Sequence, residues 1–192
     1  MSTRAFFGKG WFTRLAFSVG RHLPTAVGEQ VARVGARVLV SFDSDLRAAV
    51  FDNQRHVLGP EASPEAVRAN AYEVFRQAAR AYYELFRNVG RGRTRVAEFE
   101  PPVRVLPETR ARLQAAADTG RGVFIAGCHV SNFDLGGIAF CQEMPVPLQV
   151  LALANPTPGM ELFNRLRQQA GIMLTPISPE TLRQAIRRLR EG

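Results

Sequence analysis

Residues 122–137 read GVFIAGCHVSNFDLGG, and this stretch decides the fold class. It begins with a short apolar run between glycines, typical of a buried strand, and continues into a segment with helical character. The same alternation recurs along the chain: we expect strands at 103–106, 122–127, 148–154 and 172–177, and helices at 108–119, 132–143, 160–170 and 179–191. Strands that alternate with helices predict an α/β fold, a mostly parallel sheet with flanking helices.

The first ninety residues predict helices instead. Apolar residues recur at helical spacing between residues 25 and 58, which indicates one or two amphipathic helices. These residues are Val27, Val31, Val34, Val38 and Phe42. Ser63 before Pro64 is a cap followed by proline at the first helical position, so another helix should start there and end near Gly90. We expect one domain over 1–192, with a helical, membrane-facing part at 1–90 and an α/β part at 91–192.

Both ends of the sequence carry further signals. Residues 1–24 contain no acids, and their basic and large aromatic residues are Arg4, Lys9, Arg14, Arg21, Phe6, Phe7, Trp11, Phe12 and Phe17. This composition fits a helix on a membrane surface, and equally a helix that packs its aromatics onto the domain. No apolar run approaches the ~18 residues of a membrane span. The last helix ends at Gly192, as a helix does before another strand, so we expect the sheet to be truncated at its C-terminal end.

The charge composition is compatible with several classes of anionic partner. The formal charge is +8, from 25 basic and 17 acidic residues, and arginine supplies all the basic residues except Lys9. Such a surface suits acidic lipids, phosphate-bearing ligands or nucleic acid. No nucleic-acid-binding motif is present, so we expect no nucleic-acid partner. Cys128 and Cys141 lack metal-ligand spacing, and we expect them to be buried small apolar residues, with no metal site.

His129 and Asp134 are the candidate catalytic pair. On an uninterrupted helix, residues five apart lie ~140° around the axis and ~7.5 Å along it, so a bend must separate the two if they are to meet. His129 on the turn leaving the 122–127 strand and Asp134 in the first turn of the next helix would satisfy this, at the strand ends where α/β folds bind ligands. Alternatively, residues 131–134 form a capping box, with Ser131 as the cap and Asp134 bound to backbone N–H groups. Spacing alone favours the capping box.

Several motifs, in their order along the chain, resemble a known protein family. His129, four residues and Asp134 form an H-x4-D motif in which Asn132 and an aromatic residue precede the acid. This motif, the segment FNRLRQQAGIMLTPIS at 163–178 and the upstream segments at 23–39, 53–65 and 74–87 resemble the bacterial lipid A biosynthesis acyltransferase family, including related phosphatidylinositol mannoside acyltransferases. The resemblance covers nearly the whole chain.

The resemblance implies a membrane-associated O-acyltransferase at the cytoplasmic face of the inner membrane. It would move a fatty acyl group from an acyl carrier protein or coenzyme A thioester, used as co-substrate without any cofactor, to a hydroxyl of a lipid or glycolipid. His129 would be the general base and Asp134 its orienting acid. Arg167 matches the family's R-x3-G pattern, which implies substrate positioning or charge stabilisation. Asn132 is expected among the substrate-binding residues, and it would support the His129 loop or cap the helix.

Two alternatives stay open. Ser131 creates an H-x-S-x-x-D pattern found in glycerol-phosphate and lysophospholipid acyltransferases, where it would contact substrate, although no PEGTR-type segment follows in this chain. The other alternative is a non-catalytic, truncated membrane-binding fragment, suggested by the aromatic and basic N-terminus and the abrupt C-terminus.

Overall fold

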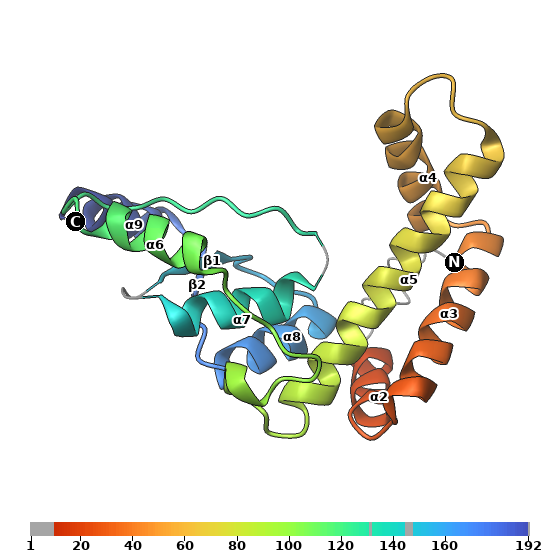
Figure 1. The fold of residues 1–192 in the computed structure, drawn as a ribbon, viewed down its shortest axis with the longest axis horizontal. Coiled ribbons are helices and arrows are strands. Elements are labelled where there is room, and N and C mark those ends of the chain that lie inside the picture. The colour runs from red at the N-terminus through yellow and green to blue at the C-terminus, as the bar shows by residue number, and fades with distance from the viewer. Residues whose placement is uncertain (1–9, 131, 145–147, 192) are drawn as a thin grey trace.

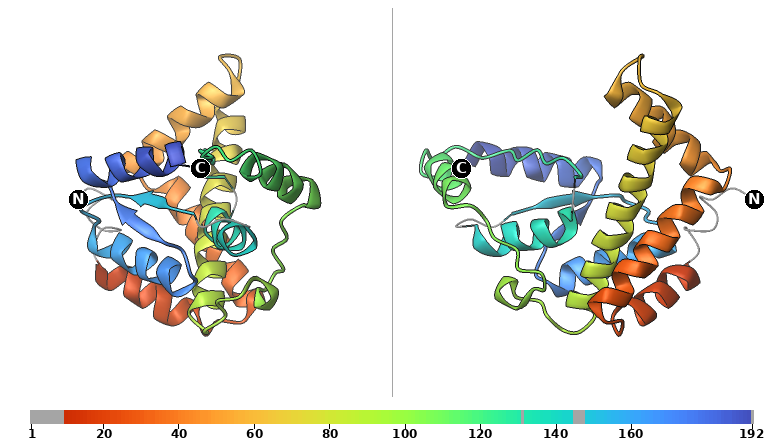
Figure 2. Two further views of the ribbon diagram at one scale, coloured as in Figure 1. Left: turned by 90° about the vertical axis from the view of Figure 1, so that its left-hand side faces the viewer. Right: turned by 45° about the vertical axis from the view of Figure 1, so that its right-hand side comes forward.

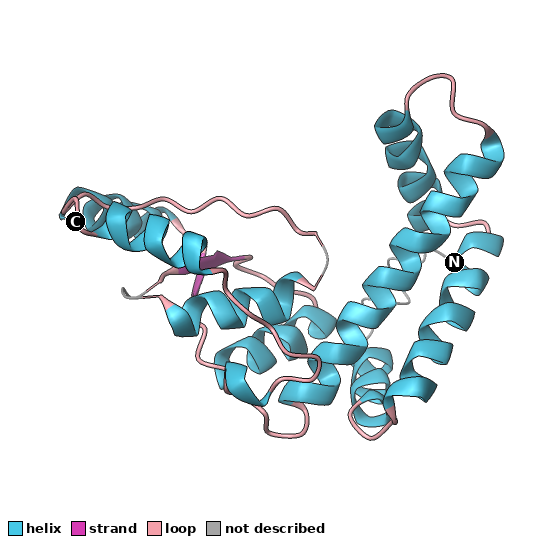
Figure 3. Ribbon diagram, viewed as in Figure 1, coloured by secondary structure: helices cyan, strands magenta, loops and turns pink. Residues whose placement is uncertain are grey.

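The computed structural model describes residues 10–130, 132–144 and 148–191, which are mostly helical (Figures 1 and 3). In chain order the elements are α2 (Gly10–Gly20), α3 (Thr25–Ser41), α4 (Asp45–Leu58), α5 (Pro64–Val89), the 3-10 helix η1 (Val96–Glu98), α6 (Pro107–Ala117), α7 (Phe133–Glu143), β1 (Val150–Ala152), α8 (Pro158–Gln169), β2 (Leu174–Pro176) and α9 (Pro179–Glu191). Of the basic and aromatic residues expected on an interfacial N-terminal helix, those at positions 4–9 lie outside the described residues.

The helical arm α3 to α5 follows the local signals in the sequence. The region 25–58 forms two helices, and Ser44 caps the second by accepting a hydrogen bond from the N–H of Arg47. Ser63 caps α5 in the same way, with Pro64 as the first helical residue, and the helix ends at Gly90. These predictions are confirmed. α5 runs diagonally through the molecule, from the free end of the arm to the other helices (Figure 1).

Helix α3 packs on α5 through small residues. Its buried positions are Gly28, Ala32, Ala36 and Val40. The predicted stripe of larger apolar residues lies on the other side, where Val27, Val31, Val34 and Val38 are all exposed. At Gly28, an added Cβ would lie 2.3 Å from Cζ of Tyr83, whose hydroxyl donates to the carbonyl of Leu23. The Tyr83 ring therefore packs directly on the backbone of α3, because Gly28 has no side chain.

Replacing Gly28 by alanine should destabilise the protein by about 1–3 kcal/mol, because the new methyl group overlaps the Tyr83 ring. Gly35 on the same helix is the matched control, since nothing lies within 4 Å of its added Cβ. There, alanine should stabilise by about 0.5–1 kcal/mol through its better helix propensity. Urea unfolding of both variants gives the two free energies. Equal effects at the two positions would contradict this account of the interface.

The sheet contains two strands in the described residues. β1 and β2 pair in parallel, with Val150 opposite Leu174. Both lie within predicted strands, and helices α6, α7, α8 and α9 occupy the four predicted helical ranges to within two residues at each end. Parallel pairing and flanking helices are therefore confirmed. The larger, mostly parallel sheet is not formed by the part of the chain that the structure describes, because the ranges 103–106 and 122–127 are irregular.

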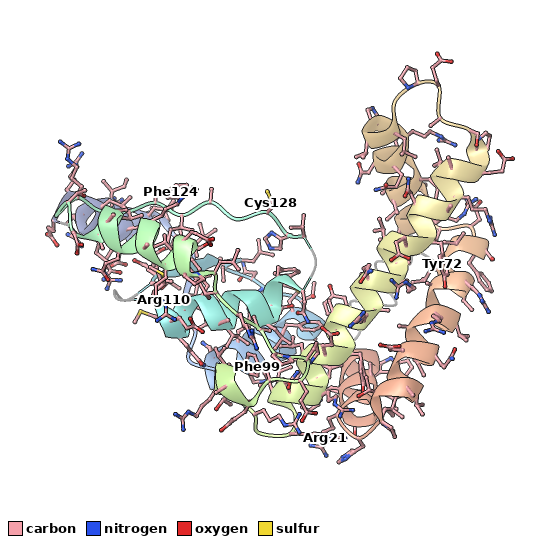
Figure 4. The ribbon with its side chains drawn as sticks, in the orientation of Figure 1. Arg21, Tyr72, Phe99, Arg110, Phe124 and Cys128 are labelled. Carbon is pink, nitrogen blue, oxygen red and sulfur yellow. The ribbon has the colours of Figure 1, made fainter. Side chains whose placement is uncertain are left out.

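The range 122–127 was predicted as a buried strand, and this is wrong. The N–H of Gly122 donates to the carbonyl of Leu189 in α9, and the chain then crosses the surface to α7 without pairing with a described strand (Figure 2). Phe124 is 79% exposed and Cys128 is exposed as well, so the prediction that Cys128 is buried is also wrong (Figure 4). An apolar run becomes a strand only where a neighbouring strand satisfies its backbone groups.

The main core joins the arm to the sheet-bearing part. It is formed by the last turns of α5 with α7, α8 and the segment before β2. Its buried members are Leu85, Phe86, Val89, Phe99, Leu135, Ile138, Leu162, Leu166, Ala170 and Ile172. Phe17 of α2 packs edge-on against Phe86, with ring centroids 5.6 Å apart. This core fixes the position of α7, whose first turn carries Asp134, the acid of the H-x4-D motif.

Candidate active site

Asn132, within the H-x4-D motif, lies at the start of α7. Its side-chain Oδ1 accepts a hydrogen bond from the N–H of Leu135 at 3.3 Å, so Asn132 is the N-cap of the helix. Of the roles expected for Asn132, the structure shows capping, and its contact with substrate stays a prediction. Ser131, the cap in the capping-box hypothesis and a predicted substrate contact, lies outside the described residues.

Asp134 pairs with Arg167. Nε of the arginine donates to Oδ1 of the carboxylate at 2.7 Å, and the side chains of Asp134 and Arg167 are only 4% and 17% exposed. A second guanidinium nitrogen of Arg167 donates to Oδ1 of Asn164 at 3.1 Å. Packing of α7 and α8 in the core therefore brings together two residues that the sequence singled out for separate reasons. Charge-assisted hydrogen bonds of this kind hold geometry firmly when they are shielded from water.

Tyr82 of α5 lies beside this ion pair. Its ring packs against Phe163 with centroids 5.0 Å apart. Burial raises the pKa of the Tyr82 hydroxyl, the negative charge of Asp134 raises it further, and the positive charge of Arg167 opposes both effects. The hydroxyl therefore stays protonated at neutral pH.

His129 is exposed and packs against Phe133. The ring centroids are 4.4 Å apart and the planes are inclined by 55°. The guanidinium carbon of Arg167 lies 5.9 Å from the centroid of the same phenyl ring, so Phe133 contacts both side chains. Within the described residues, no hydrogen bond or ion pair joins His129 to Asp134. The expected direct contact across the turn is therefore not made in this conformation, because the carboxylate is turned toward α8.

Glu84 of α5 belongs to the site and was missed in the sequence. Its Oε2 accepts a hydrogen bond from Nδ2 of Asn132 at 2.5 Å, and its Oε1 accepts one from Nε of Arg80 at 2.8 Å. Glu84 is buried although it carries a carboxylate. A signal was present: within YYELF at 82–86, the acid interrupts an apolar run, and a polar Asn88 follows one helical turn later.

The surroundings of the motif are open. Two shallow, open hollows in the described residues are lined by the segments 95–114 and 142–143, and His129 and Asp134 line neither. Within the residues placed by the structure, no cluster of three or more His, Cys, Asp or Glu side chains could hold a metal ion. Cys141 is half-buried, and burial raises the pKa of its thiol. The chemistry available is that of an exposed imidazole, a buried carboxylate and an arginine.

Comparison with known proteins gives one match. The model of a family described as bacterial lipid A biosynthesis acyltransferase matches residues 3–192. No curated protein and no solved structure matches the chain significantly.

Proposed function

The chain belongs to the bacterial lipid A biosynthesis acyltransferase family, and from this premise we propose that it transfers a fatty acyl group from a thioester to a hydroxyl of a lipid or glycolipid. Membership implies acyltransferase activity, with a lipid acceptor and an acyl thioester donor in general terms. The proposal adds acyl carrier protein or coenzyme A as the thiol carrier and requires no cofactor. The observation that supports it is Asp134, held by Arg167 in the first turn of α7, five residues after His129.

His129 is the proposed general base. One ring nitrogen removes the proton of the acceptor hydroxyl while the oxygen attacks the thioester carbonyl carbon. The carbon–sulfur bond of the resulting tetrahedral intermediate then breaks, and the imidazolium returns its proton to the leaving thiolate. The products are an ester and a free thiol, and the enzyme ends the cycle unchanged. An exposed imidazole suits this role because both large substrates must reach it.

Asp134 is proposed to orient the imidazole. Its ion pair with Arg167 uses Oδ1, and we assign Oδ2 to a ring nitrogen of His129 in the substrate-bound enzyme. Catalytic hydrogen bonds are often unmade in free enzymes and form only when substrate is present. The negative charge would then stabilise the imidazolium as it develops. Arg167 would then act by holding the Asp134 carboxylate in position, which is how we interpret the positioning or charge-stabilising role expected for Arg167.

The developing oxyanion also needs hydrogen-bond donors. Backbone N–H groups in the first turn of α7 point toward the end of the helix that carries partial positive charge. Asn132 already caps the N–H of Leu135, and we assign the N–H groups of Phe133 and Asp134 to the oxyanion. Donors that are fixed before the reaction stabilise the transition state more than mobile ones do.

The test is acyl transfer from labelled acyl carrier protein and acyl-coenzyme A to a panel of acceptors. Transfer to a hydroxyl of lipid A precursors or glycolipids supports the proposal. Transfer confined to glycerol phosphate or lysophospholipids would support the alternative suggested by Ser131. Vesicle binding with no transfer to any acceptor would favour the non-catalytic fragment and exclude both enzymes.

For the location, we propose peripheral attachment to the cytoplasmic face of the inner membrane through α2 and α3. Leu15 and Val19 of α2 are exposed, as is the valine stripe of α3, defined as Val27, Val31, Val34 and Val38. Exposed Arg14, Arg33 and Arg37 lie on the same helices and would attract anionic headgroups. Among the described residues, no helix combines the length and the apolar character needed to cross a bilayer.

Replacing both Val31 and Val34 by serine should weaken binding to vesicles that contain anionic lipid by roughly tenfold, since about 1–2 kcal/mol of apolar burial is lost. Sedimentation with vesicles measures this. The control is Val57→Ser on α4, a valine that is even more exposed than Val31 and Val34 but lies away from the stripe; this variant should bind as the parent does. If the stripe variant also bound as the parent does, α3 would not be the lipid-facing helix.

A further inference from the structure

The contact between Glu84 of α5 and Asn132 connects the helical arm to the catalytic motif. We propose that Glu84 is a positioning residue for acyl transfer: by holding the Asn132 amide in one orientation, it sets the first turn of α7 and with it Phe133, Asp134 and His129. This inference rests on the proposed function. It concerns a residue 48 positions away from Asn132 in the sequence.

The Glu84 carboxylate has a fixed donor at each oxygen. Arg80, one turn earlier on α5, donates to Oε1, and Asn132 donates to Oε2. The next turn of the helix is anchored by Asn88, which is fully buried. Its amide nitrogen donates to the carbonyls of Glu84 and Glu100, and its Oδ1 accepts from the N–H of Glu100. Glu84 therefore projects from a well-anchored part of the helix.

The carboxylate determines which way the Asn132 amide faces. The carboxylate accepts only, so the amide must turn its nitrogen toward Glu84 and its oxygen toward the N–H of Leu135. A rotated amide would set oxygen against oxygen and nitrogen against N–H. The same amide thus caps α7 and ties that cap to α5. Phe133 and Asp134 follow in the first turn, and the ring of His129 rests on Phe133.

The variant Asn132→Asp tests the contact with Glu84 separately from the capping of α7. Aspartate caps helices as well as asparagine does, so the bond to Leu135 can remain. The donor to Glu84 is lost, however, and two carboxylates would face each other. We expect kcat to fall by about 100-fold with KM little changed, because a displacement of ~1 Å in a catalytic group costs that much.

The double variant Glu84→Gln with Asn132→Asp restores the contact with reversed polarity. The glutamine amide can donate to the new carboxylate, while its oxygen still accepts from Arg80. We expect kcat of the double variant to recover to within about tenfold of the parent. In Glu84→Gln alone, one acceptor oxygen faces two donors, Arg80 and Asn132. Its kcat should therefore lie between that of Asn132→Asp and that of the double variant. A residue that served only to fold the protein would not show rescue by a second polar substitution.

A second readout does not depend on activity. The chain has three histidines, so their imidazole proton resonances are easily separated, and those of His129 should be shifted upfield by the Phe133 ring. This shift should decrease in Asn132→Asp and return in the double variant. Glu73→Gln is the matched control: Glu73 also lies on α5 and pairs with an arginine, Arg76, and its substitution should change neither readout.

The outcomes separate the inference from the proposed function. If Asn132→Asp keeps the parent's kcat and His129 shift, or if the double variant restores neither, Glu84 does not position the motif. If the parent transfers no acyl group while the His129 shift is lost and restored as described, the proposed function fails and the positioning contact stands. Should Asn132→Asp fail to fold, Glu84→Gln alone decides: a parental kcat and His129 shift would overturn the inference.

Discussion

Replacing His129 by alanine should lower kcat for acyl transfer by about 10²–10⁴-fold, the range that a positioned general base contributes. The free energy of unfolding should change by no more than about 0.5 kcal/mol, because the side chain is exposed and its ring contact is with Phe133 alone among the described aromatic residues. Transfer of labelled acyl groups to the lipid acceptor gives the rate, and urea unfolding gives the stability.

A second histidine provides the control for this experiment. His56 is exposed on α4, where its Nδ1 lies 2.9 Å from the carbonyl oxygen of Asp52, and its replacement by alanine should leave kcat unchanged. If the His129→Ala variant transferred acyl groups at the parent's rate, His129 would not be the general base. A loss of rate accompanied by unfolding would also contradict the expectation, since it would assign a structural role to an exposed side chain.

Arg167→Met should lower the free energy of unfolding by about 3–5 kcal/mol. The substitution leaves the Asp134 carboxylate buried without its cation, and an uncompensated buried charge is costly. Activity should fall in parallel, because Asp134 loses the partner that fixes its orientation. Urea unfolding measures the loss of stability, and circular dichroism shows whether the helices are retained.

Removing the charge as well should recover much of that loss. In the double variant Asp134→Asn with Arg167→Met, the buried group is neutral, and at least about 2 kcal/mol should return. Arg33→Met is the control for an exposed pair: Arg33 faces Glu29 at 3.6 Å on the surface of α3, and its loss should cost less than about 1 kcal/mol. A double variant no more stable than Arg167→Met would mean that the buried charge is not what makes the single variant unstable.

Helices were predictable from the sequence, but the extent of the sheet was not. Ser63 and Pro64 lie next to each other, and a helix start depends on such neighbours, so its position could be predicted to the residue. Whether residues 122–127 form a strand depends on a partner elsewhere in the chain, and apolar composition does not reveal one. Periodicity likewise identified the α3 valines as one stripe, but did not show that small residues on the opposite side would make the contact with α5.

The site was predictable in its members more than in its contacts. The motif and the resemblance singled out His129, Asp134 and Arg167, but the resemblance implied a contact between the first two, whereas spacing alone favoured a capping box. The observed bond joins the last two, across 33 residues, because core packing places α7 against α8. Glu84 was missed since its partner is 48 residues away, and only its isolation among apolar neighbours marked it. Its effect on catalysis stays a prediction.

The small residues between α3 and α5 have a consequence for the environment in which the arm is stable. Gly28, Ala32 and Ala36 recur every four residues, the spacing by which helices in bilayers associate. An interface of this kind is stabilised by close van der Waals contact more than by the hydrophobic effect. The α3–α5 pair is therefore suited to keep its geometry in detergent or at a lipid surface, where cores that depend on bulky side chains lose part of their driving force.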